Sequence, residues 1–375
     1  SVASGDVTTN TSSTNLWLVP LAGGEARRLT ATAKSDFLPR WAPDGRTVTF
    51  VSSRGGEAEL WTIPVAGGEA TKLGGAALGV EGPAVWSPKG DRLLFAGKAY
   101  PQCKVDPCNA AEAKRREQSK VKAEVFDALL YRHWNAWRHG QVNHVFSLTL
   151  SDRTVRDLTP GKYDAPPLAL GGDVDYALSP DGRRAATVMN TDALVATSTN
   201  NDVFLQRTPG GAWERITTSQ ANDHSPRFTP DGKAVIYLAM SVPKYEADRQ
   251  RLVRYDLATR KHQTLTEAFD RSVDGYVIAP DGRTIFFTAH DQGYVPVFAV
   301  PATGGAVRTV VAKVFATGLQ ISPDGRTLVF AAHATDRPPE VYKAPAAGGA
   351  AVRLTGMNDD LRARTRRSPV EHLWY

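Results

Sequence analysis

Aspartates recur in this chain at one position of a repeated Pro-Asp-Gly turn. A pair of carboxylates can share acid and base work in catalysis, and alternating oxygen ligands can bind calcium. Neither chemistry fits here, because these aspartates belong to five separate repeats and "DGR" lacks the alternating ligands of a calcium loop. We therefore predict a structural role in the turn for Asp44, Asp181, Asp231, Asp281 and Asp324.

The two cysteines, Cys103 and Cys108, lie close together in "CKVDPC". A short spacer that contains a proline can bring two Cα atoms within disulfide reach. A zinc site would want four ligands, and neither a histidine nor a second cysteine pair lies nearby. We therefore favour a disulfide over a metal site, and with it an oxidising compartment such as the periplasm or the cell exterior.

The sequence offers no recognisable nucleophile. It contains no Gly-x-Ser-x-Gly elbow, no His-Glu-x-x-His pair and no phosphate-binding glycine loop before a helix. Structural or surface roles are expected for five histidines at unrelated repeat positions, His224, His262, His290, His333 and His372. We predict a binding or gating body with no catalytic residue, no metal and no cofactor, and treat a metal-dependent propeller lyase as the weaker alternative.

The elements that position these residues come from a repeat. "WAPDGRTVTF" returns as "WSPKGDRLLF", "LSPDGRRAAT", "FTPDGKAVIY", "IAPDGRTIFF" and "ISPDGRTLVF". The turns recur about every 45 to 50 residues, with one interval about twice as long, which is typical of four-stranded propeller blades with one insertion. Proline presets φ, aspartate binds nearby backbone N–H groups, and glycine supplies the positive φ that closes a hairpin.

A second template occurs between these turns in seven copies, for example "LWTIPVAGGEATKLG" and "VYKAPAAGGAAVRLT". Most copies indicate a strand, a Gly-rich or polar turn, and a strand that ends in an apolar-Thr step. The second template occurs seven times and the Pro-Asp-Gly template six times. Together they predict an all-β, seven-bladed β-propeller of four-stranded blades. The first blade would be incomplete, with "SVASG" as the tail of its second strand.

The third repeat is enlarged by a helical and hairpin insertion at about 96–141. Asn109 and Glu112 have the spacing of a capping box, which predicts a helix there, and "RHGQ" is expected to form a hairpin tip. A recognition surface for substrate is expected from three residues of the insertion, Arg132, Trp134 and Trp137. The alternative is that the tryptophans cap the core of their own blade.

The composition leaves room for a sizeable core and argues against nucleic-acid binding. Hydrophobic residues make up 42% and charged residues 22% of the chain, as in ordinary globular proteins. The net charge of +6 is spread along the sequence, whereas a nucleic-acid site concentrates cations on one face. The sequence contains no apolar run of about 18 residues, so it predicts no membrane span. No signal peptide is visible in it.

Two groups of motifs resemble a known family. "DFLPRWAPDG" and "DHSPRFTPDG", together with "LWTIPVAGGEATKL", resemble the propeller repeats of TolB-type periplasmic proteins and of the prolyl oligopeptidase family. The insertion "CNAAEAKRREQSKVKAEVFDALLYRHWNAWRHGQVNHVFSLTL" is similar to the bacterial acylaminoacyl-peptidase and dipeptidyl-peptidase branch of that family. "LTGMNDDLRARTRRSPVEHLWY" resembles its passage into the hydrolase domain, so the resemblance covers essentially the whole chain.

The resemblance implies a propeller at 1–357 and a linker at 358–375 that leads toward an α/β-hydrolase domain. That domain would carry the Ser, Asp and His of a serine peptidase, and no such residue can be assigned within this sequence. The propeller would gate the access of short peptides and help to bind them, with the three insertion residues near the hydrolase domain.

The implied partners are short peptides and the hydrolase domain of the same polypeptide, without nucleic acid or membrane. A homo-oligomer is left open, and the implied location is periplasmic or secreted. A stand-alone TolB-like propeller that binds other proteins is the alternative function.

Overall fold

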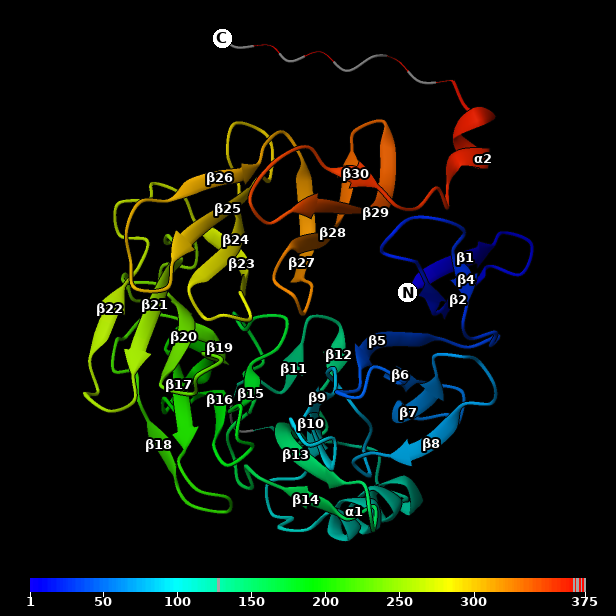
Figure 1. Ribbon diagram of the computed structural model, residues 1–375. Coiled ribbons are helices and arrows are strands. Elements are labelled where there is room, and N and C mark those ends of the chain that lie inside the picture. The colour runs from blue at the N-terminus through cyan, green and yellow to red at the C-terminus, as the bar shows by residue number, and fades with distance from the viewer. Residues whose placement is uncertain (127–128, 367, 369–370, 372, 374–375) are drawn as a thin grey trace. The chain divides into compact units, whose positions relative to one another are not determined.

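The computed structural model describes residues 1–126, 129–366, 368, 371 and 373, and Figure 1 shows them as ribbons. They form two compact units. The first unit comprises Ser1–Trp17, Arg28–Phe228 and Val235–Asp248, and the second comprises Leu18–Arg27, Thr229–Ala234 and Arg249–Tyr375. His372 lies outside the described residues, so the role predicted for it stays a prediction.

Six four-stranded antiparallel sheets make up most of the fold, and the strands of each sheet pair in chain order. The sheets are β5 (Asp36–Trp41), β6 (Thr47–Ser52), β7 (Glu59–Pro64) and β8 (Thr71–Gly74); β9 (Val85–Trp86), β10 (Arg92–Ala99), β13 (Val142–Thr149) and β14 (Val155–Asp157); β15 (Tyr176–Leu178), β16 (Ala185–Asn190), β17 (Asn201–Gln206) and β18 (Trp213–Arg215); β19 (Asp223–Phe228), β20 (Ala234–Ala239), β21 (Arg251–Asp256) and β22 (His262–Thr264); β23 (Val273–Ile278), β24 (Thr284–Ala289), β25 (Val297–Pro301) and β26 (Arg308–Val311); and β27 (Phe315–Ile321), β28 (Thr327–Ala334), β29 (Arg337–Pro345) and β30 (Val352–Arg353).

The N-terminal segment forms two smaller sheets, one of β1 (Val2–Asp6) with β2 (Thr11–Asn15) and one of β3 (Trp17–Leu18) with β4 (Arg27–Arg28). "SVASG" therefore contributes to a strand, and the all-β propeller is confirmed. The described residues nevertheless hold six four-stranded sheets where seven blades were predicted. The N-terminal copy of the second template forms the two-stranded sheet of β3 and β4 and not a four-stranded one.

The Pro-Asp-Gly turns join the first and second strands of their sheets. Each turn glycine has a positive φ, such as 71° at Gly282, and its N–H donates to the carbonyl three residues earlier, as from Gly282 to Ala279 at 2.8 Å. Each aspartate accepts the backbone N–H two residues ahead, at 2.8 to 3.0 Å for Asp44, Asp181, Asp231, Asp281 and Asp324. These five carboxylates therefore hold turns, as predicted.

The apolar-Thr step closes five of the repeats, two residues beyond the last strand. In five repeats the threonine hydroxyl accepts a backbone N–H from the preceding long strand or its start, as between Thr217 and Val203 at 2.8 Å. The apolar residue before the threonine donates its own N–H to the carbonyl of that same residue, as from Ile216 to Val203 at 2.9 Å. The sequence motif is thus a two-bond clamp between strands.

Strand β10 shows why the central strands are continuously apolar. Leu93 and Phe95 belong to a buried cluster with residues of β6 and β7, whereas Leu94 and Ala96 belong to a second cluster with residues of β16 and β17. Successive side chains of a strand point to opposite faces of its sheet. This sheet therefore buries both faces, and its central strands need apolar side chains at consecutive positions.

Hydrogen bonds and an ion pair fix the segment that follows the last sheet. The buried carboxylate of Glu340 accepts the N–H groups of Met357 and Asn358 at 3.1 and 3.0 Å. α2 (Asp359–Ala363) follows, and Arg353 binds Asp359 through two 2.8 Å hydrogen bonds. The segment predicted as a linker from 358 onward thus begins with a short helix bound to β30. Among the described residues, no helix is long and apolar enough to cross a membrane.

Two buried aspartates at matching repeat positions have different partners. Asp36 accepts the Ser52 hydroxyl and the Arg54 guanidinium, both at 2.6 Å. Asp223 accepts the Ser219 hydroxyl at 2.9 Å, and within the described ranges no cation lies at ion-pair distance from it. Burial, reinforced by the charge of nearby Asp202, raises the pKa of Asp223 to about 7.

This raised pKa predicts a stability that falls with pH. The folded protein holds the Asp223 proton more tightly than the unfolded chain, so the contribution is complete below pH about 4 and is lost as pH rises through about 7. Asp223→Asn, which cannot ionise, should lie close to the wild type in melting temperature at pH 4 and exceed it at pH 8. The expected gain at pH 8 is on the order of 3 kcal/mol, measured by thermal melts followed by circular dichroism.

Asp324→Asn is a control of opposite sign. The Ser322 hydroxyl and the Arg326 N–H lower the pKa of Asp324, so this variant should lose stability at neutral pH and approach the wild type in acid. A constant offset between Asp223→Asn and the wild type from pH 4 to 8 would contradict the prediction.

Candidate functional site

The irregular part of the repeat pattern is a long connection between two paired strands. β10 and β13 pair along their whole length, from Arg92 with Thr149 to Ala99 with Val142. The insertion therefore occupies 100–141, and it starts four residues later than the sequence indicated. Gly97 and Lys98 rank low in strand propensity, which hid the end of β10.

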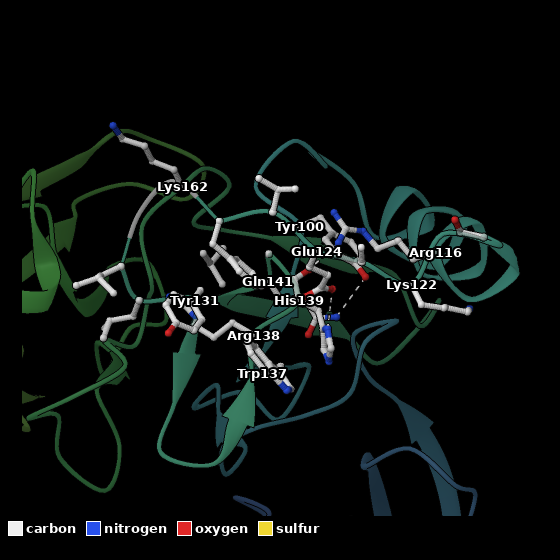
Figure 2. A pocket seen from close by; sticks show the side chains of 18 of the residues that line it. Tyr100, Arg116, Lys122, Glu124, Tyr131, Trp137, Arg138, His139, Gln141 and Lys162 are labelled. Atoms are coloured by element: carbon white, nitrogen blue, oxygen red, sulfur yellow. Dashed lines mark hydrogen bonds and ion pairs between the residues drawn. The ribbon is translucent and has the colours of Figure 1, made fainter.

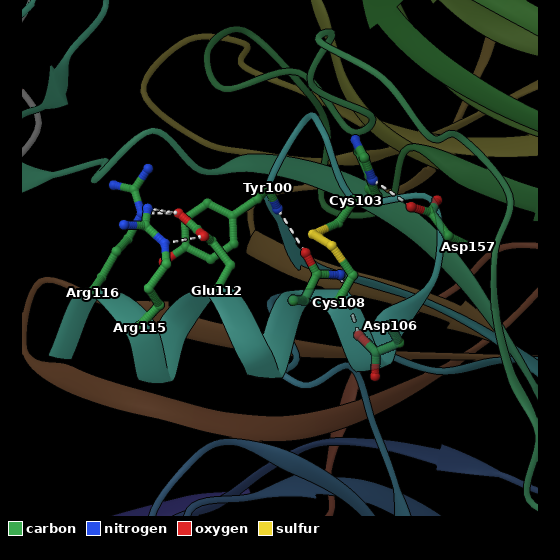
Figure 3. The surroundings of a disulfide bond; sticks show 10 residues. Tyr100, Cys103, Asp106, Cys108, Glu112, Arg115, Arg116 and Asp157 are labelled. Carbon is green, nitrogen blue, oxygen red and sulfur yellow. Dashed lines mark hydrogen bonds and ion pairs between the residues drawn. A yellow bond between two sulfur atoms is a disulfide. The ribbon is translucent and has the colours of Figure 1, made fainter. Parts of the chain in front are cut away.

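The first turn of helix α1 (Asp106–Gln118) is fixed to neighbouring turns, and Figure 3 shows the disulfide there. A disulfide joins Cys103 to Cys108, with Cα atoms 5.5 Å apart. The Asp106 carboxylate accepts the backbone N–H of Ala77 through both oxygens, at 2.9 and 3.0 Å. Proline in this first turn presets helical φ, so the helix begins before Asn109 and not at it.

Asn109 is therefore a buried residue inside the helix, and its side-chain oxygen accepts the N–H of Tyr100 at 2.8 Å. One turn later Glu112 binds Arg115 and Arg116, each at 2.7 Å. Hydrogen bonds from these two guanidiniums lower the pKa of Glu112 to about 2. Arg116 also donates to the His139 carbonyl at 2.9 Å, which links the helix to the end of the insertion.

A small hairpin carries the aromatic residues of the insertion. β11 (Arg132–His133) pairs with β12 (Ala136–Trp137), and the tip lies at 134–135. "RHGQ" forms a second tight turn with positive φ at His139 and Gly140, but this turn leads from β12 into β13. The prediction of a hairpin tip at "RHGQ" is therefore wrong in position. The tip lies at 134–135, and "RHGQ" is a second tight turn a few residues later.

Three aromatic rings stack beside this hairpin. Ring centroids of Phe126 and Tyr131 are 4.8 Å apart, and Trp137 lies 5.7 Å from each of them. Trp137 remains 55% exposed and Phe126 38% exposed. An exposed stack of this kind offers flat apolar surface to a ligand.

The aromatic stack lines a hollow of ≈ 1220 Å³ between the insertion and the loop that follows β14. Its lining includes the residues shown in Figure 2, Tyr100, Arg116, Lys122, Glu124, Tyr131, Trp137, Arg138, His139, Gln141 and Lys162. In that view Lys162 lies above Tyr131 at the left, Arg138 and Trp137 lie in the lower centre, and Arg116 and Lys122 lie at the right. The hollow is large enough for several residues of an extended peptide.

Ion pairs fix part of the lining. Arg138 binds Asp164 at 2.6 Å, and His139 contacts Glu124 at 2.9 Å. Burial raises the pKa of Asp164, although the Arg138 charge opposes this shift. These pairs hold the 138–141 turn against the neighbouring loop, because Asp164 also accepts the N–H of Asn143 at 2.8 Å.

The structure separates the three residues predicted for substrate binding. Trp137 lines the hollow, whereas Arg132 and Trp134 stand at the hairpin tip, where the Arg132 guanidinium donates to the Trp134 carbonyl. Trp134 is 83% exposed. The alternative in which the tryptophans cap a sheet core is therefore wrong.

Sequence reasoning missed Phe126 and Tyr131 as partners of Trp137, although the aromatic content of this stretch was a usable signal. It also missed His144, whose ring binds Asp157 at 2.7 Å and the Gly161 carbonyl at 3.0 Å in the sheet interior. Nothing in the sequence marks that pair. In the described part of the chain, no group of three or more His, Cys, Asp or Glu could hold a metal ion.

The proteins similar to this chain in sequence include several named as peptidases. No protein-family model matches the chain. Dipeptidyl-peptidase 5 of Porphyromonas gingivalis is 28% identical over 381 residues, which cover 98% of this chain and 54% of that protein. Dipeptidyl-peptidase 5 of Trichophyton equinum is 33% identical over 235 residues, which cover 57% of this chain and 32% of that protein. The chain thus spans about half the length of the first relative.

Solved structures show the same fold. Acylaminoacyl peptidase of Pyrococcus horikoshii superposes with a TM-score of 0.72 at 16% identity, over 97% of this chain and 51% of that one. The β-propeller domain of the Trilobed protease from Pyrococcus furiosus gives 0.62 at 14% identity, over 97% of this chain and 93% of that one. An oligogalacturonate lyase in complex with manganese gives 0.63 at 13% identity, over 91% and 83%. At these identities the likeness concerns the fold alone.

Because an oligogalacturonate lyase shares the fold, the fold alone does not indicate a peptidase. The repeat and insertion motifs, the fold and the match to dipeptidyl-peptidase 5 across the chain agree. The chain is thus similar to dipeptidyl-peptidase 5 over nearly its whole length and has the β-propeller fold of acylaminoacyl peptidase, which is consistent with the N-terminal propeller of a prolyl oligopeptidase-family peptidase.

Proposed function

We propose that the chain is the non-catalytic propeller of a serine peptidase of the acylaminoacyl- or dipeptidyl-peptidase type. It would gate the access of short peptides to a Ser-Asp-His site in an α/β-hydrolase domain of the same polypeptide. The observation that carries this proposal is the match to dipeptidyl-peptidase 5 over 98% of the chain, which accounts for 54% of that relative. The segment 1–28, with its two small sheets, would then belong to a seventh blade.

The hollow at the insertion is the proposed place where the propeller helps to bind peptides. It combines exposed stacked rings with charged side chains from two neighbouring connections. Rigid aromatic surface beside charged groups is typical of peptide recognition, because rings bind apolar side chains at low entropic cost. Arg132 and Trp134, outside the hollow, keep their predicted position near the hydrolase domain as part of this proposal.

The disulfide supports an oxidising location, periplasmic or secreted. Thiol titration of the unfolded, unreduced protein is expected to find no free thiol, and titration after reduction should find two. Two free thiols in freshly isolated material would contradict both the disulfide and the location.

Active-site labelling tests the proposed family role. A fluorophosphonate probe should label the full-length polypeptide at a serine outside 1–375 and should leave the 375-residue chain unlabelled. The full-length polypeptide should hydrolyse short aminoacyl-arylamides. A gene whose reading frame closes without a hydrolase domain would contradict the proposal.

Kinetics of the full-length polypeptide test the hollow. Trp137→Ala removes one ring of the stack and should raise KM for short peptides about three- to tenfold at nearly unchanged kcat, because the ring binds substrate and transition state alike. Trp134→Ala is the matched control, since it removes an exposed tryptophan of the same hairpin outside the hollow. Equal KM values for the two variants would contradict a role of the hollow in binding.

A further inference from the structure

The lining of the hollow carries an excess of positive charge. Five cationic side chains line it, Arg115, Arg116, Lys122, Arg138 and Lys162, against two carboxylates, Glu124 and Asp164. Asp164 is neutralised by Arg138 at 2.6 Å. Glu112 similarly engages both arginines of α1 from outside the lining.

Two of these cations have no carboxylate partner in the described ranges. The Lys122 ammonium donates to the Glu117 carbonyl at 3.0 Å, and the Lys162 ammonium lies 5.1 Å from the centroid of the Tyr163 ring. Both side chains are exposed, and in Figure 2 they lie well apart, Lys162 above Tyr131 at the left and Lys122 at the right. Each keeps donors available for an anionic group of a ligand.

The same hollow has an apolar part. Tyr131 and Trp137 stack face to face with an interplanar angle of 27°, and Val195 adds an aliphatic wall from the η1 turn (Val195–Thr197). A peptide bound in this hollow can present one side chain to these rings and a neighbouring one to an ammonium group of the same lining.

We propose that the hollow selects peptide segments that carry an acidic side chain next to an aromatic or large apolar one. This specificity deepens the proposed function and rests on its peptide-binding role. Lys122 and Lys162 supply the charge discrimination, and the Tyr131–Trp137 stack supplies the apolar contact. A basic peptide meets uncompensated like charge, and a neutral polar one gains neither contribution.

Four capped tetrapeptides isolate the two contributions. N-acetylated, C-amidated Gly-Asp-Phe-Gly, Gly-Asn-Phe-Gly, Gly-Lys-Phe-Gly and Gly-Asp-Ala-Gly differ only in the two central side chains. Binding to the chain is measured by isothermal titration calorimetry at 50 mM and 500 mM NaCl. We expect the Asp-Phe peptide to bind about five- to tenfold more tightly than the Asn-Phe peptide at low salt, and this preference should shrink at high salt because ions screen exposed charges.

Variants assign the preference to residues. Lys122→Met with Lys162→Met keeps the aliphatic stems and should remove the preference for Asp over Asn, whereas Lys89→Met, an exposed lysine in a distant hairpin turn, should leave it unchanged. Trp137→Ala should weaken the Asp-Phe and Asn-Phe peptides equally, and Trp134→Ala should weaken neither. Melting curves confirm that each variant is folded.

The outcomes separate this inference from the proposed function. Binding of the Asp-Phe and Asn-Phe peptides with equal affinity, or a preference that survives the double lysine substitution, would overturn the specificity and leave peptide binding in place. No binding of any of the four peptides would overturn both.

Discussion

The burial of both faces of each central strand is the constraint on which the rest of the structure depends. In the first unit, β10 sends alternate side chains into two separate cores. In the second unit, Phe286 on β24 joins a cluster with β28, while its neighbour Phe287 packs on Phe298 from the other face. These central strands expose almost no side chains, so binding surfaces are expected on the connections between strands.

The connection from β10 to β13 uses that freedom under local restraint. Forty-odd residues could close a loop at modest entropic cost, but a flexible loop would not hold a stack of rings in one place. The disulfide and the Asp106 carboxylate fix one end of α1, and Arg116 fixes the other end to the 138–141 turn. The Arg138–Asp164 pair then joins that turn to the next connection. The hollow is thus built by polar contacts around an apolar stack, with little core of its own.

The sequence predicted the parts of the fold that a repeat makes visible. The positive φ of the turn glycines and the carboxylate bonds of the turn aspartates follow from residue type alone. The start of α1 did not, because a proline and a disulfide moved it ahead of Asn109. Six of the seven predicted repeats form four-stranded sheets, whereas the N-terminal one forms only two-stranded sheets. In the hollow, Trp137 could be singled out in the sequence by its residue type. Its separation from Trp134 depends on a hairpin whose two-residue strands leave no periodicity to detect.

Repetition in sequence therefore does not repeat the chemistry. Asp36 and Asp223 begin the same motif, yet the residues paired opposite them differ, with Ser52 opposite Asp36 and Ala239 opposite Asp223. The first carboxylate is bound by a guanidinium and the second is left with a hydroxyl, and burial raises the pKa of the second to about 7. At this repeat position, the neighbouring strand therefore determines which groups bind the aspartate. The insertion at 100–141 shows the same effect for a whole connection. β10 and β13 keep their pairing, while the residues between them form most of the surface of the hollow.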